Sequence, residues 1–205
     1  MPFLSAQGIA ELTGADFVPF GTEIGRSFGV PAYSNETSGL ISDEINENLG
    51  VFSGMKWQCV EYARRFMQTV LGATFAGVYG AQNIWFLDTA SRLEDGASIP
   101  FATVPNGSSD ALPEVGSLLI YPISENCPFG HVAVVVKADP ESGLVYLAEQ
   151  NWDSRVWPKD RSYSRTVQVE KTSRGTYFLR DESGEQILGW KTVGLLTSRY
   201  PKFSS

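Results

Sequence analysis

The sequence has 205 residues and a formal net charge of −7, from 16 basic and 23 acidic side chains. Hydrophobic residues make up 42% and charged residues 19%, a composition that supports a packed core and excludes a disordered, self-repelling chain. The longest clear apolar run, Val132–Val136, is far shorter than the roughly 20 residues of a membrane-spanning helix. Because nucleic-acid binding needs a basic surface, we expect neither a membrane nor a nucleic-acid partner.

The cysteine and histidine content narrows the chemistry further. Cys59 and Cys127 are too few for a disulfide framework, and residues 1–8 lack the basic and apolar segments of a secretory signal. We therefore expect a cytoplasmic protein with one domain over residues 1–205. His131 is the single histidine, which excludes a zinc site built on two or three histidines, and we expect no metal and no cofactor.

The first half of the chain predicts loops and helices. The first 55 residues are rich in Gly, Ser, Pro and Asn and predict mostly loops, with a short helix at Ile41–Gly50. Apolar residues at helical spacing predict the clearest helix at Trp57–Leu71, ended by Gly72. A second helix is predicted at Tyr79–Ala90, and the prolines and the Asn-Gly pair of residues 100–113 predict a connection.

From Val115 onward the pattern changes to short apolar segments separated by turn residues, which indicates strands. We predict them at residues 117–121, 131–137, 144–149, 165–171, 176–180 and 187–193. Helices followed by antiparallel strands favour an α+β fold, with N-terminal helices packed on a C-terminal antiparallel β-sheet.

Cys59 falls in the first turn of the clearest predicted helix. Free backbone N–H groups and the helix dipole favour a thiolate there, and a thiolate is the attacking species in nucleophilic cysteine catalysis. The position is equally compatible with a small buried residue of the helix face. A catalytic role therefore depends on which partners the rest of the chain supplies.

His131 opens a predicted strand, and the following turn suggests its partner. If the hairpin is centred near Pro140, Glu149 lies opposite His131, where a carboxylate would fix the tautomer of the imidazole and stabilise its charged form. Asn151 shares the same strand face and is a rival for this orienting role, because a shift in register would change the pairing. The order Cys59, His131 and Glu149 is that of a cysteine peptidase or amidase.

The segment Lys56–Phe66, Lys-Trp-Gln-Cys-Val-Glu-Tyr-Ala-Arg-Arg-Phe, resembles the nucleophile helix of CHAP-family cysteine amidohydrolases, which have a papain-like fold. Further segments resemble the amidase domain of glutathionylspermidine synthetase/amidase and of trypanothione synthetase: Pro19–Thr22, Val104–Ser108, Gly116–Ile120, Gly130–Ala133, Ala148–Asn151 and Ile187–Trp190. The resemblance runs from about residue 17 to residue 193.

The resemblance implies that Cys59 is the nucleophile, His131 the general base and acid, and Glu149 the residue that orients His131. It implies hydrolysis of glutathionylspermidine, a thiol–polyamine conjugate, to glutathione and spermidine through a glutathionyl-enzyme thioester. The bifunctional members also carry an ATP-dependent synthetase domain. That domain is absent from these 205 residues, so we expect no ligation.

Four further residues are candidates for oxyanion or substrate binding. The backbone N–H of Cys59, with Gln58, is placed to hold an oxyanion, and Arg64 is placed to anchor a carboxylate. Asn151 and Trp152 follow the predicted strand end and are expected to line the cleft. Two other functions stay open: a CHAP peptidoglycan amidase or endopeptidase, and an inactive CHAP-like binding module.

Overall fold

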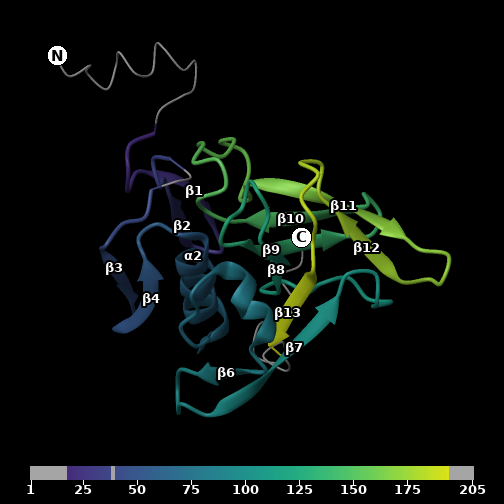
Figure 1. Cartoon of the computed structure of the whole chain (residues 1–205), viewed down its shortest axis with the longest axis horizontal. Helices are drawn as coiled ribbons and strands as arrows, with labels where there is room; N and C mark the ends of the chain where they lie inside the picture. Colours follow the sequence, from purple (N-terminus) through teal and green to yellow (C-terminus); the bar gives the residue numbers. More distant parts are fainter. Residues whose placement is uncertain (1–17, 38–39, 194–205) are drawn as a thin grey trace.

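The computed structural model describes residues 18–37 and 40–193 (Figure 1). The prediction that residues 1–8 contain no secretory signal concerns residues outside that part. Both ends of the expected domain and the start of the resemblance at residue 17 also lie outside it. The main body is a nine-stranded antiparallel sheet in the order β12-β11-β10-β9-β8-β13-β7-β6-β5. Its strands are β5 (Ala73–Thr74), β6 (Thr89–Arg92), β7 (Ser98–Pro105), β8 (Leu118–Tyr121), β9 (His131–Asp139), β10 (Leu144–Ala148), β11 (Arg165–Lys171), β12 (Tyr177–Arg180) and β13 (Gly189–Val193).

Two small hairpins precede the sheet in sequence. Strands β1 (Glu23–Ser27) and β2 (Val30–Tyr33) form one, and β3 (Ile45–Asn48) and β4 (Val51–Met55) form the other. The expectation that the first 55 residues are mostly loops is therefore wrong for these segments.

The helical content is smaller than the sequence predicts. The α-helix α2 (Cys59–Phe66) continues as a π-helical turn, η1 (Met67–Leu71), and ends at Gly72, which adopts a left-handed conformation. The predicted helix and its stop at Gly72 are confirmed. Within residues 18–37 and 40–193, however, α2 is the single α-helix, so the expectation of several N-terminal helices packed on the sheet is wrong.

Two other predicted helices take different structures. Ile41–Gly50 contains β3, because Leu49 and Gly50 both have positive φ angles and form the tight turn of the β3–β4 hairpin. Tyr79–Ala90 reduces to the 3-10 helix η2 (Ala81–Phe86). It is held at its start by Asn83, whose side chain accepts a hydrogen bond from the Gly80 N–H at 3.1 Å.

Residues 100–113 are only partly the predicted connection, because β7 extends to Pro105. Pro100 and Pro105 lie within this strand, and Ile99 and Phe101 alternate with exposed neighbours, as a half-buried strand requires. The six strands predicted from residue 117 onward are confirmed as β8 to β13, with shifts of up to two residues at their ends.

Both faces of the central sheet are buried, and alternation along each strand sorts the side chains between them. Val132, Val134 and Val136 of β9 pack in the cluster that contains Tyr62 and Phe66 of α2. Residues of the other parity form a second cluster: Leu119, Tyr121, Ala133, Val135, Val145, Leu147, Val167, Leu179, Ile187 and Trp190. The helix therefore covers one face of the sheet, and its first residue, Cys59, belongs to the cluster on that face.

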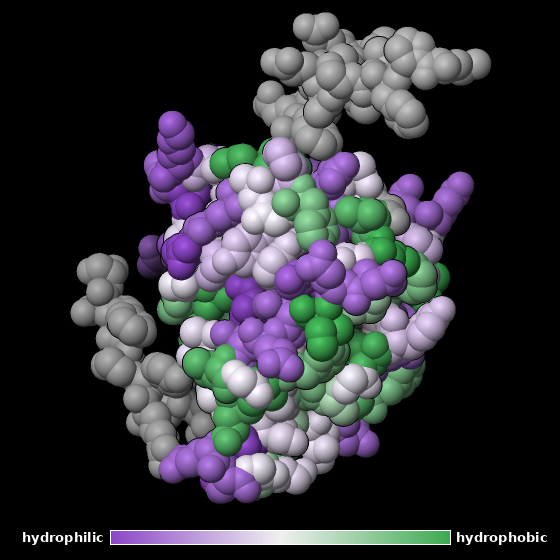
Figure 2. Space-filling model, turned by 90° about the vertical axis from the view of Figure 1, so that its left-hand side faces the viewer, coloured by the Kyte–Doolittle hydropathy of each residue, from purple (hydrophilic) through white to green (hydrophobic). Residues whose placement is uncertain are grey.

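Figure 2 looks onto the side of the molecule that carries the β3–β4 hairpin. Hydrophobic side chains form separate patches there, interrupted by hydrophilic ones. No helix within the described residues is both long and apolar enough to pass through a bilayer.

Candidate active site

Four polar side chains lie together at one end of the neighbouring strands β8, β9, β10 and β11. Tyr121 ends β8 and pairs with His131, the first residue of β9. Glu149 directly follows β10, and Arg165 opens β11 opposite Leu147. All four share strand parity with the second buried cluster, so they lie on one face of four neighbouring strands.

The backbone at Gly130 fixes how the chain enters β9. Gly130 has a φ of 70°, and a Cβ there would lie 2.6 Å from the carbonyl oxygen of Tyr121 and 2.9 Å from the backbone nitrogen of Gln82. A larger residue would push the loop away from these atoms. Gly130 thus allows the close approach that places His131 at the strand start.

His131 contacts Glu149 and not its rival Asn151. Its Nε2 lies 2.8 Å from Oε2 of Glu149, and the two side chains are 4% and 2% exposed. The two side chains are thus in contact, as the sequence predicts, although not through the strand pairing assumed there, and their catalytic roles stay predictions. Because Glu149 occupies Nε2, the other ring nitrogen, Nδ1, is the one available to Cys59.

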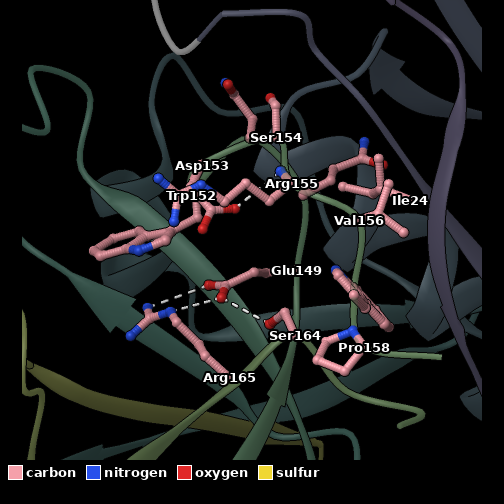
Figure 3. Close-up of a pocket in the computed structure, with 13 residues that line it drawn as sticks. Ile24, Glu149, Trp152, Asp153, Ser154, Arg155, Val156, Pro158, Ser164 and Arg165 are labelled. Atoms are coloured by element: carbon pink, nitrogen blue, oxygen red, sulfur yellow. Dashed lines mark hydrogen bonds and ion pairs between the residues drawn. The ribbon is translucent and has the colours of Figure 1, made fainter. Parts of the chain in front are cut away.

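Glu149 is held from its other side by residues that the sequence reasoning missed. Its Oε1 accepts hydrogen bonds from Ser164 Oγ at 2.8 Å and from Arg165 Nε at 2.7 Å, as the dashed lines in Figure 3 show. Arg165 also pairs with Asp181, and both Arg165 and Asp181 contact the hydroxyl of Tyr121. This network fixes the carboxylate of Glu149 before any substrate binds.

Burial raises the pKa of the Glu149 carboxyl, but the charge of Arg165 and the hydrogen bond with His131 outweigh it and lower that pKa to about 2. Glu149 is therefore ionised at neutral pH.

A sequence signal for Arg165 existed, since it opens a predicted strand as His131 does. Using that signal required knowing that β11 pairs with β10, where Arg165 lies opposite Leu147, 18 residues earlier in the chain.

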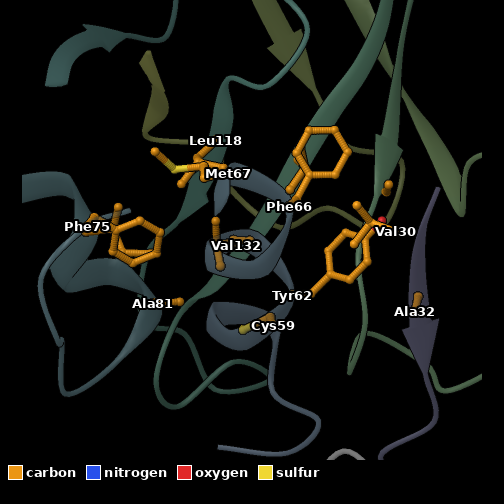
Figure 4. Close-up of a cluster of buried hydrophobic side chains, with 14 of the residues drawn as sticks. Val30, Ala32, Cys59, Tyr62, Phe66, Met67, Phe75, Ala81, Leu118 and Val132 are labelled. Atoms are coloured by element: carbon orange, nitrogen blue, oxygen red, sulfur yellow. The ribbon is translucent and has the colours of Figure 1, made fainter. Parts of the chain in front are cut away.

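Cys59 is the first residue of α2 and lies at one end of the buried cluster with Tyr62 and Phe66 (Figure 4). The backbone N–H groups of a first helical turn have no acceptor within the helix. Burial raises the pKa of the Cys59 thiol, but the charge of His131 and the hydrogen bond with it, aided by the N–H groups of Val132 and Val60, lower it below its ordinary value. The arrangement favours a thiolate.

His131 shows the matching shift. Burial lowers the pKa of its imidazole, but the Cys59 thiolate, a hydrogen bond with it and the Glu149 carboxylate together raise that pKa to about 9. The two shifts favour a thiolate–imidazolium pair between Cys59 and His131. This is the charge state that attacks a carbonyl without a separate deprotonation step.

These shifts predict the pH dependence of the Cys59–His131 pair. Alkylation of Cys59 by iodoacetamide should show its inflection below the ordinary thiol pKa of about 8.5, and the His131 signal should titrate near pH 9. Because the chain has one histidine, its NMR signals can be followed directly. Cys59→Ala should lower the pKa of His131, since the thiolate is the largest influence that raises it. An alkylation inflection near pH 8.5 together with a histidine pKa near 6.5 would contradict the ion pair.

The residue between Glu149 and Asn151 ties this strand end to the nucleophile helix. Gln150 donates from Nε2 to the carbonyl of Gln58 at 3.0 Å and to Glu61 Oε2 at 2.7 Å. Glu61 in turn forms a buried ion pair with Arg65 at 2.7 Å. Glu61 therefore anchors Gln150 at the nucleophile helix, a role of Gln150 that the sequence reasoning missed.

Asn151 and Gln58 bind one another across the cleft. Asn151 Nδ2 donates to Gln58 Oε1 at 2.8 Å, and its Oδ1 accepts from the buried Asn35 at 3.1 Å. Gln58 Nε2 donates to the carbonyl of Leu40 at 2.9 Å. Both residues line the cleft beside Cys59, and their binding of an oxyanion or substrate stays a prediction.

Arg64 also lines the cleft, but its guanidinium is already bonded. It donates to the carbonyls of Ser53, Phe75 and Ala76, and it stacks 4.4 Å from the centre of the Phe75 ring. Burial lowers the pKa of Arg64 to about 10. These contacts favour a role in bracing α2 against β4 and its neighbours, and the predicted anchoring of a substrate carboxylate by Arg64 remains untested.

Trp152 covers the charged groups of the site. Its ring lies 3.9 Å from the Arg165 guanidinium carbon and 4.8 Å, edge to face, from the His131 ring. It lines the main cleft, which has a volume of about 520 Å³ and also contains Cys59 and His131.

A smaller pocket of about 190 Å³ lies beside Glu149, under the segment 152–158 (Figure 3). No group of three His, Cys, Asp or Glu suited to a metal ion occurs among the residues described.

Comparison with known proteins agrees with this geometry. Residues 50–151 match the CHAP domain. The chain is 32% identical over 145 residues to the glutathionylspermidine synthase of Crithidia fasciculata, covering 68% of this chain and 19% of that protein. It is 33% identical over 180 residues to the trypanothione synthetase of the same organism, covering 85% and 27%.

A third relative is the bifunctional glutathionylspermidine synthetase/amidase of Escherichia coli (strain K12), which is 32% identical over 188 residues, covering 87% of this chain and 30% of that protein. The chain thus spans less than a third of the length of each of these relatives. Together with the helix and antiparallel sheet that meet at Cys59 and His131, these matches show that the chain belongs to the CHAP family.

Proposed function

We propose that the protein is a cysteine amidase in which Cys59 attacks the carbonyl carbon of an amide and His131 transfers the protons. The observation that supports this most directly is the 2.8 Å contact between His131 Nε2 and Glu149 Oε2, which leaves Nδ1 for the Cys59 thiol. The thiol lies at a helix N-terminus inside the cleft of about 520 Å³. The helix N-terminus and the imidazolium both favour the thiolate.

The proposed reaction has two steps. The Cys59 thiolate forms a bond to the carbonyl carbon, and the oxyanion that develops accepts a hydrogen bond from the backbone N–H of Cys59. The C–N bond then breaks, and the His131 imidazolium donates its proton to the leaving nitrogen, giving a thioester and a free amine. Water next transfers a proton to His131 and attacks the thioester, and cleavage of the C–S bond releases the acid and restores the thiolate.

The proposed substrate is glutathionylspermidine. Two of the relatives are named for the synthesis of this compound, and one of these is also named as an amidase. Attack at its glycyl carbonyl would release spermidine first and glutathione second. The substrate is therefore a small-molecule thiol–polyamine conjugate, and the reaction needs no cofactor.

A panel of substrates tests this proposal. The purified protein would be incubated with glutathionylspermidine, with a peptidoglycan peptide fragment and with an unrelated dipeptide amide, and the products analysed by mass spectrometry. Equal amounts of glutathione and spermidine from the first substrate alone would support the proposal. Cleavage of the peptidoglycan fragment alone would assign a different substrate to the same thiol, and no cleavage of any substrate would favour an inactive binding module.

A further inference from the structure

The chemistry of the proposed reaction places the leaving amine on the His131 side of Cys59. His131 must donate its proton to that nitrogen, so the amine lies against the residues that surround the imidazole. The loop of residues 126–130 runs directly into His131, and each of its residues lines the main cleft. This loop therefore forms the wall that faces the departing amine.

Two aromatic side chains lie in this wall. Tyr79 and Phe129 both line the cleft and contact each other edge to face, with ring centres 5.9 Å apart. Tyr79 is 90% exposed and Phe129 42% exposed, although aromatic rings are normally covered. They offer a free aromatic surface beside the reacting centre.

The backbone beneath these rings is fixed. The N–H of Gln82 donates to the carbonyl of Phe129 at 3.3 Å, and the Gln82 side chain accepts from the N–H of Ile123 at 2.6 Å. Gly80 packs so closely on Phe129 that a Cβ there would lie 2.8 Å from its carbonyl oxygen. The aromatic pair is thus held in place before a ligand arrives.

A carboxylate, that of Glu185, lies behind this wall and is not itself among the residues that line the cleft. Asn126, which lines the cleft, donates a hydrogen bond to the Glu185 carboxylate at 2.9 Å. Among the described residues that line the cleft, Glu61 and Arg64 are bonded to protein groups, and the imidazolium of His131 is paired with Glu149. Glu185 therefore has no competing free cation in the described cleft lining.

We propose that Tyr79, Phe129 and Glu185 form a binding site for the alkylammonium chain of the leaving amine, the spermidine arm of the proposed substrate. Aromatic faces attract organic cations and also cover their methylene groups, and the carboxylate supplies the opposite charge. This inference rests on the proposed function for the identity of the amine. The site selects amines with a second positive charge over neutral alkyl amines.

The test compares a charged and a neutral leaving group in matched variants. The substrates are glutathionylspermidine and a glutathione alkyl amide of similar chain length. For Tyr79→Leu and for Glu185→Gln, the ratio of kcat/KM between the charged and the neutral substrate should fall about threefold to tenfold through KM. Phe86→Ala is the control, because Phe86 is 67% exposed on η2 but does not line the cleft. An unchanged ratio in both variants would overturn the site.

A binding measurement separates this inference from the proposed function. Free spermidine should bind the native protein by calorimetry, and Tyr79→Leu and Glu185→Gln should each weaken that binding about threefold to tenfold. If the native protein cleaves neither substrate while spermidine binding depends on both residues, the proposed function fails and the site stands. If the conjugate is cleaved but neither variant changes selectivity or binding, the site is wrong and the amidase assignment stands.

Discussion

Replacing Cys59 with alanine should reduce kcat for amide hydrolysis by about 10⁴-fold or more, because the covalent intermediate cannot form. The other thiol of the cleft, Cys127, does not replace it. Burial and the nearby Glu185 carboxylate raise the pKa of Cys127, whereas His131 lowers that of Cys59. Activity would be measured by product release, and the trapped thioester by mass spectrometry of the native protein.

Cys127→Ala is the matched control for this prediction, since it removes a thiol from the same cleft without touching His131. It should retain activity within about threefold, a change of less than 1 kcal/mol in the activation barrier. Loss of activity in Cys127→Ala with activity retained in Cys59→Ala would assign the nucleophile to the other cysteine. Circular dichroism of both variants would show whether a loss comes from unfolding.

Replacing Glu149 with glutamine should reduce kcat by about 10² to 10⁴, the range seen when the carboxylate that orients a catalytic histidine becomes an amide. The amide cannot neutralise the imidazolium, so the pKa of His131 should fall and that of Cys59 should rise. The alkylation profile of Cys59 should therefore move to higher pH in this variant. A merely structural role for Glu149 would lower thermal stability without moving that profile.

Glu170→Gln provides the control for Glu149→Gln. Glu170 is also a carboxylate bonded to an arginine, Arg180, at 2.6 Å, but the pair is exposed on β11 and β12. Exposed pairs contribute about 0–1 kcal/mol to stability. Its activity and alkylation profile should match those of the native protein, and equal losses in the two variants would contradict a specific role for Glu149.

The contact between His131 and Glu149 could be predicted although the assumed register was wrong. In the structure Leu147 pairs with Val135 and Ala148 with Val134, so the register continued by one residue places Glu149 opposite Ala133. The bulge between Tyr146 and Leu147 lessens this shift by one residue, because the register before it, if continued, would place Glu149 opposite Val134. Glu149 keeps the same strand parity as His131 and reaches it diagonally. The sequence shows parity within each strand, but it is the bulge that brings Glu149 to the face of His131.

Contacts between distant segments could not be predicted in this way. Arg165 meets Glu149 only because β11 pairs with β10, and Asp181 joins them from beyond β12. The predicted helix at Ile41–Gly50, where the structure has the β3–β4 hairpin, is wrong for a local reason. Leu49-Gly50 forms a tight hairpin turn that the sequence does not mark with the usual Asn-Gly or Asp-Gly pair.

The side chains of the consecutive residues Glu149, Gln150 and Asn151 tie the base to the start of the nucleophile helix. They bind, in turn, His131 of β9, the start of α2 through the Gln58 carbonyl, and the Gln58 side chain. The relative position of nucleophile and base is thus set by one tripeptide and not by the loops that form the cleft wall. In those loops, around Tyr79 and residues 126–130, side chains can change while the reacting atoms stay aligned, provided that Gly130 is kept. This separation lets new amine specificities arise, in evolution or by design, without rebuilding the catalytic machinery.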